Sequence, residues 1–99
     1  MTRIPKPASD RGPYETERQV RETPAVRAVY DAFDAAPGPG RMTPHCHRML
    51  CEALAGAGVE LGEHDHRTVL WLAGWGPETA AVIAGLIIRA RAAGLAGTP

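Results

Sequence analysis

Residues 69–93, VLWLAGWGPETAAVIAGLIIRARAA, contain the longest apolar run of the chain and both of its tryptophans. From Ala80 to Ile88, nine consecutive residues have no polar side chain. A surface helix carries a single apolar stripe, whereas a helix that is apolar on every side is buried. The stretch therefore predicts an all-α protein built around a central hydrophobic helix near its C-terminal end.

The limits of this central helix follow from the residues at its ends. Pro77 comes directly after Trp75-Gly76. Proline suits the first position of a helix, because its fixed φ is already helical and its missing N–H would be unpaired there. Glu78 in the first turn complements the positive end of the helix dipole, and Gly94 is the kind of residue that ends a helix. We expect a helix over 77–93.

Small residues and tryptophans in this stretch indicate an interaction surface. Ala81 and Gly85 lie in one row at i,i+4 spacing. A glycine inside a helix costs about 1 kcal/mol relative to alanine, which suggests that another helix, from this chain or from a second copy, crosses there. Trp71 and Trp75 are also four residues apart, and protein interfaces are enriched in Trp. These four residues are predicted to bind a protein partner or a second copy in a twofold dimer.

The preceding residues predict a short polar helix over 14–21 and three longer helices. Thr23-Pro24 and Thr43-Pro44 each combine an N-cap residue with a proline at the first helical position. PGPG at 37–40 separates the two helices that these pairs begin. The longer helices are expected from 24 up to that linker, over 44–57 and over about 63–73. The predicted fold is a compact bundle of four helices plus the short polar one.

Length and composition limit the classes of protein to which the chain can belong. The 99 residues are enough for one domain, which we expect over 14–93, between a flexible arm at 1–13 and a flexible tail at 94–99. Eleven basic and eleven acidic residues give a net charge of zero, which argues against a dedicated nucleic-acid binder. A membrane span needs about 20 apolar residues, and the longest run has nine, so no membrane association is expected.

All four histidines and both cysteines lie between positions 45 and 66. His47 and Cys51 are four residues apart on a predicted helix and therefore point the same way. With His64 and His66 from the next helix they would supply four ligands of the types that zinc prefers. The alternative is that the histidines are simply exposed and the cysteines pack as small apolar residues.

Three consecutive helices joined by short turns that contain glycine also satisfy the outline of a helix-turn-helix. The last helix is apolar in its middle and cannot present polar side chains to base edges. If nucleic acid is bound, the contacts are expected from Arg41, Arg48 and Arg67 instead. The alternative is that these arginines are ordinary solvated side chains.

The function predicted from the sequence is a small non-catalytic module for protein interaction or regulation, without a cofactor and with a homodimer as one form. A DNA-associated regulator of helix-turn-helix type is the second reading, and a Cys/His metal-binding module is the third. No nucleophile is accompanied by both a base and an orienting group at a recognisable spacing, so an enzyme is not expected. Because no apolar leader precedes the two cysteines, we expect reduced thiols and a cytoplasmic location.

Overall fold

The computed structural model describes residues 11–96, and this part of the chain forms five α-helices and no strand. The predicted all-α helical bundle is confirmed. The helices are α1 (Glu17–Arg21), α2 (Pro24–Ala35), α3 (Thr43–Gly56), α4 (Glu63–Ala73) and α5 (Pro77–Ala96). None of them is long and apolar enough to cross a lipid bilayer.

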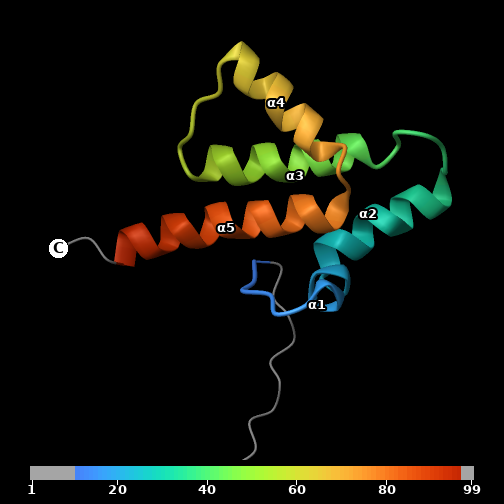
Figure 1. Ribbon diagram of the computed structural model, residues 1–99, viewed down its shortest axis with the longest axis horizontal. Helices are drawn as coiled ribbons and strands as arrows, with labels where there is room; N and C mark the ends of the chain where they lie inside the picture. The colour runs from blue at the N-terminus through green and yellow to red at the C-terminus, as the bar shows by residue number, and fades with distance from the viewer. Residues whose placement is uncertain (1–10, 97–99) are drawn as a thin grey trace, which may run out of the picture.

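The fold is organised around the pair α3 and α5. Figure 1 shows these two helices side by side and running in the same direction, with α4 leaning across α3 on one side. On the other side, α1 lies beneath the beginning of α5, and α2 extends away beyond that end. α4 connects the parallel pair, because it returns the chain to the end at which α3 began. The last helix is therefore central in position, as its hydrophobicity predicts.

Two clusters of buried side chains form the core. The larger one joins α2, α3, α4 and α5 and consists of Val29, Cys46, Leu50, Ala53, Ala73, Ala80 and Ala84. The smaller one joins α1, α2 and α5 and consists of Val20, Val26 and Ala81. Leu50 and Val26 are the largest apolar side chains that are fully buried among the described residues. Most of the core is therefore made of small side chains, which let the helix backbones approach one another closely.

The expectation that α5 is buried on all sides is wrong. Its small residues Ala80, Ala81 and Ala84 are at most 5% exposed. Its large residues are not enclosed, since Leu86 is 52% exposed and Val82, Ile83 and Ile87 are only half-buried. The helix turns its small face inward because close packing against α3 requires small side chains. Leu86 consequently lies outside, whereas Val82, Ile83 and Ile87 lie at the edge of the core and pack partly against it.

Several helix ends differ from the predicted ones. α5 continues through Gly94 to Ala96, since one glycine costs only about 1 kcal/mol in a helix and alanines surround it. α1 is limited to Glu17–Arg21 because Thr16 and Gln19 form a capping box in which each side chain accepts a hydrogen bond from the other's backbone N–H. α3 begins at Thr43 itself, with Met42 as the N-cap residue.

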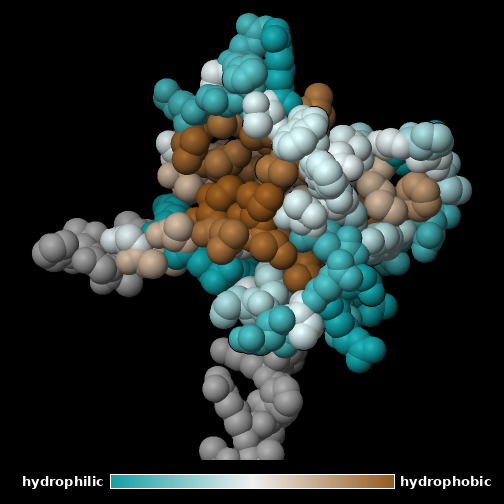
Figure 2. Space-filling model, in the orientation of Figure 1, coloured by the Kyte–Doolittle hydropathy of each residue, from teal (hydrophilic) through white to brown (hydrophobic). Residues whose placement is uncertain are grey.

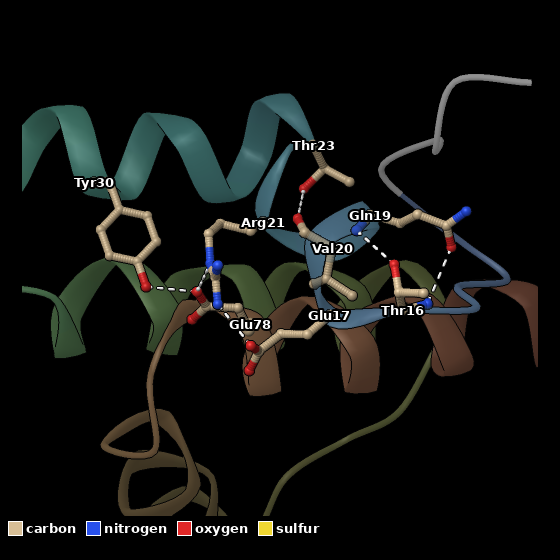
Figure 3. Close-up of polar contacts among 8 residues, drawn as sticks. All are labelled: Thr16, Glu17, Gln19, Val20, Arg21, Thr23, Tyr30 and Glu78. Carbon is tan, nitrogen blue, oxygen red and sulfur yellow. Dashed lines mark hydrogen bonds and ion pairs between the residues drawn. The ribbon is translucent and has the colours of Figure 1, made fainter.

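Thr23 precedes α2 as predicted, but its hydroxyl does not cap the helix. The side chain is fully buried, and its Oγ1 donates a hydrogen bond of 2.7 Å to the backbone carbonyl of Val20. The hydroxyl therefore joins the end of α1 to the start of α2 inside the core, as Figure 3 shows.

Residues 11–13 do not form part of a free arm. The Arg89 Nε donates a hydrogen bond of 2.8 Å to the carbonyl of Arg11, and a Cβ added at Gly85 would lie only 2.6 Å from that carbonyl oxygen. Gly85 is therefore the site of a close crossing, as predicted. The crossing element is not a helix but the segment that precedes α1. The rest of the predicted arm, 1–10, and residues 97–99 of the predicted tail lie outside the described residues.

Candidate interaction surface and Cys/His cluster

The outward face of α5 carries four large aliphatic residues, Val82, Ile83, Leu86 and Ile87, which we call the α5 ridge. Their spacing of three and four residues places them along one side of the helix. Three of them, Val82, Ile83 and Leu86, form one wall of an open groove whose other wall is the chain from Pro13 to Val20. Figure 2 shows hydrophobic residues gathered in one patch over the middle of α5 and toward α4. Val82, Ile83 and Leu86 thus form an apolar wall along α5.

Trp71 and Trp75, at the end of α4 and in the turn that follows it, form a second exposed apolar feature. Their ring centroids are 5.8 Å apart and the rings meet edge to face at 79°. The two side chains are 64% and 63% exposed. Since a tryptophan side chain has roughly 250 Å² of surface, the pair leaves about 300 Å² in contact with water. That area alone approaches the largest apolar patch of an ordinary monomer, about 300–600 Å².

The other two predicted interaction residues are not on the surface. Ala81 is 1% exposed and packs with Val20 and Val26 of α1 and α2. Gly85 is buried against the backbone of Arg11. The prediction that this small-residue row contacts a partner is corrected, because the chain's own N-terminal portion already covers it.

A polar contact that the sequence reasoning missed fastens α1 and α2 to the start of α5. The Glu78 carboxylate accepts hydrogen bonds from the Tyr30 hydroxyl at 2.6 Å and from the Arg21 Nε at 3.2 Å. Arg21 also pairs with Glu17 at 2.6 Å, so three helices meet at one carboxylate (Figure 3). Tyr30 and Arg21 lie 48 and 57 residues away from Glu78, and no local pattern signals such a pairing.

The acid–base properties of this contact follow from its geometry. The hydrogen bond to Glu78, then burial and the carboxylate charge, raise the pKa of Tyr30 from 10.0 to about 12. Burial alone would raise the pKa of Glu78, but the hydrogen bonds from Tyr30, its own backbone and Arg21, together with the charge of Arg21, outweigh it and lower that pKa. The network is therefore most stable with Glu78 ionised and Tyr30 protonated.

The structure brings together three of the four predicted metal ligands. The ligand atoms of His47, Cys51 and His66 all lie within 4.8 Å of one another, and the Cys51 Sγ is 3.5 Å from the His47 Nε2. His47 and Cys51 come from α3 and are half-buried, whereas His66 comes from α4 and is exposed. His64 is not within reach of the cluster. Cys46 belongs to the core, and burial followed by the charge of Glu78 raises the pKa of its thiol.

The three arginines of the DNA-binding alternative have separate local partners. Arg67 forms an ion pair of 2.7 Å with Glu63 on the exposed side of α4. Arg48 lines a hollow against α2 and approaches the His45 ring at 3.4 Å. Arg41 lies in the loop before α3, beside Gly38. None of these contacts unites the three side chains into one basic surface on the described part of the chain.

Comparison with known proteins adds no relative. No protein-family model, curated protein or solved structure matches this chain. Function is therefore inferred from two features of the molecule, the apolar surface on α4 and α5 and the Cys/His cluster between α3 and α4.

Proposed function

We propose that this chain is a non-catalytic interaction module of the cytosol that pairs with a second copy of itself. The interface consists of the α5 ridge and the Trp71–Trp75 pair. One observation carries the proposal: the most hydrophobic helix packs its alanines inside, leaves Leu86 52% exposed and only half-buries the large residues beside it. Packing against α3 accounts for the buried alanines, but it leaves these large side chains partly in water, where they lack the stabilisation that full burial would give.

The exposed apolar area would supply a substantial part of a standard interface. A standard interface buries about 800 Å² on each partner. The two tryptophans supply about 300 Å² of that area, from their exposed fractions of 64% and 63%, and the ridge adds to it. At about 25 cal/mol per Å², burying only the tryptophan area of both copies would contribute about 15 kcal/mol before the entropic cost of association, which is about 4–15 kcal/mol. The ridge would add further apolar area to this contribution.

Charge favours a second copy as the partner. The net charge of zero removes the repulsion that keeps strongly charged proteins apart. The groove along the ridge carries the carboxylates of Glu17 and Glu78 toward the start of α5, both in contact with Arg21, and Arg89 farther along the helix. A twofold axis that sets two ridges antiparallel would place the acidic end of one copy against the Arg89 end of the other. In that arrangement the charges of the two copies would be complementary, as an isologous interface requires.

Sedimentation equilibrium over a range of concentrations tests the proposal. The wild-type protein should form dimers, and Leu86→Glu should weaken the dimer. The substitution removes roughly 1.5 kcal/mol of favourable Leu burial from each copy. Because both copies of a twofold dimer carry it, the loss enters the free energy of dimerisation twice. The dissociation constant should therefore rise at least about 100-fold. Trp75→Glu should have an effect of the same direction.

Val59→Glu is the matched control. Val59 is 45% exposed, similar to Leu86, but it lies between α3 and α4 beside Cys51 and Leu61, and its substitution should leave dimerisation unchanged. A wild-type protein that remains monomeric at the highest attainable concentration would refute self-association. Equal weakening by Val59→Glu and Leu86→Glu would show that the ridge is not the interface.

A further inference from the structure

We infer that His47, Cys51 and His66 form a binding site for a divalent transition-metal ion of the zinc class. The inference is independent of dimerisation, because the cluster lies between α3 and α4 and shares no residue with the α5 ridge or the tryptophan pair. It rests on the types of the three ligands, on their spacing, and on their surroundings.

The ligand spacing is close to that of a tetrahedral site. With Zn–S of about 2.3 Å and Zn–N of about 2.0–2.1 Å, tetrahedral angles place ligand atoms about 3.3–3.6 Å apart. The Cys51 Sγ and the His47 Nε2 are already 3.5 Å apart. All three ligand atoms lie within 4.8 Å of one another. The third ligand therefore needs to move by little more than 1 Å to reach tetrahedral spacing, and His66, the exposed member, is the side chain with room to do so.

The ligand types select the ion. One thiolate and two neutral imidazoles are ligands that suit zinc and cobalt better than the hard cations calcium and magnesium. Binding would release the proton of the Cys51 thiol to solvent. Three protein ligands leave the fourth position of a tetrahedral ion for water or another ligand, and the exposure of His66 gives the cluster access to solvent.

The surroundings of the cluster also fit a metal site. Leu54, Val59 and Leu61 line the hollow beside Cys51 and His66, and an apolar surround strengthens the attraction between a cation and a thiolate. His47 and Cys51 lie one turn apart on α3, and His66 lies on α4. A bound ion would therefore connect the two helices across the loop at 57–62 and stabilise their packing.

Titration of the full-length reduced protein with Co²⁺ tests the site. Cobalt takes the same geometry as zinc, and its spectrum reports both a thiolate ligand and tetrahedral coordination. We expect one Co²⁺ per chain with a thiolate-to-cobalt charge-transfer band, displaced by Zn²⁺. The band should be absent in Cys51→Ala. In His66→Ala the affinity for Co²⁺ should fall at least about 100-fold, because removing a residue that only hydrogen-bonds to a metal ligand already lowers metal affinity about 10–100-fold.

His64→Ala is the matched control, because His64 lies two residues from His66 on the same helix but outside the cluster. This variant should retain the wild-type cobalt spectrum and affinity. Far-UV circular dichroism establishes that each variant is folded, and the midpoint of thermal unfolding should rise with Zn²⁺ in wild type but not in Cys51→Ala. No charge-transfer band in the wild type, a band that survives in Cys51→Ala, or equal losses in His64→Ala and His66→Ala would overturn the inference.

Discussion

A methyl group added at Gly85 tests whether the N-terminal segment packs on α5. An ideal Cβ at this position would lie 2.6 Å from the carbonyl oxygen of Arg11 and 3.1 Å from its carbonyl carbon. Both contacts involve backbone atoms, so Gly85→Ala must move residues 11–13 away from the helix. The displaced segment would lose the 2.8 Å hydrogen bond from the Arg89 Nε to the Arg11 carbonyl.

Two opposing effects determine the change in the free energy of unfolding. Alanine is favoured over glycine inside a helix by about 1 kcal/mol, which stabilises α5. A hydrogen bond to a charged group contributes about 1.5–3 kcal/mol, and the exposure of Arg11 places this one at the lower end. We therefore expect Gly85→Ala to lower the free energy of unfolding by up to about 1 kcal/mol, although it improves helix propensity.

Gly94→Ala is the control in the same helix. A Cβ added at Gly94 meets nothing within 4 Å, so this variant should gain up to about 1 kcal/mol. Urea denaturation at one protein concentration should therefore separate the two variants by about 1–2 kcal/mol. Trypsin, which cleaves after arginine, should cut after Arg11 faster in Gly85→Ala than in Gly94→Ala. Equal gains in stability and equal cleavage at Arg11 would refute the packing described for this segment.

Three further predictions concern polar contacts. In a spectrophotometric titration, Glu78→Ala should return the pKa of Tyr30 from about 12 toward its ordinary value of 10.0, because the hydrogen bond to the carboxylate is the main cause of the raised pKa. An unchanged titration would contradict that contact. The pKa of Glu78 is lower in the folded protein than in the unfolded chain. The ionised carboxylate therefore stabilises the fold at a pH above its unfolded pKa, and this stabilisation is lost as the pH falls through its folded pKa. Glu78→Gln should consequently make the free energy of unfolding depend less on pH in the acidic range. Thr23→Val removes a buried hydroxyl that donates a hydrogen bond to the carbonyl of Val20, and it should lower the free energy of unfolding in urea by about 1 kcal/mol. Thr68→Val, at an exposed position, should change it by less than about 0.5 kcal/mol. Equal effects of the two substitutions would count against the buried hydrogen bond.

The sequence predicted most of the residues of the candidate metal site, but not which of them lie together. His47 and Cys51 could be paired from their i,i+4 spacing, because helix geometry alone places them together. The choice between His64 and His66 depends on how α4 is rotated against α3, and only the fold sets that rotation. Tyr30 and Glu78 carried no signal at all, since their contact joins positions 48 residues apart.

The all-α class and the first residues of most helices follow from local signals in the amino-acid sequence. Pro24 and Pro77 begin α2 and α5, and the acids of the first turn mark the start of α4 at Glu63. Each of these signals acts within one helical turn, through a fixed φ, an unpaired N–H or the helix dipole. The prediction that the helix ends at Gly94 was wrong, because the small local cost of one glycine does not outweigh the helix propensity of the alanines around it.

Which face of each helix is covered depends on the tertiary packing and could not be predicted from local signals. Hydrophobic periodicity shows which residues share a face, and α5 is apolar on every side, so its sequence could not say which side packs. Close approach to α3 selected the alanine face, and the segment before α1 occupied Gly85. Leu86 and the tryptophans were left outside as a result. Burial depends on what the rest of the chain brings to a surface, and that is a property of the whole fold.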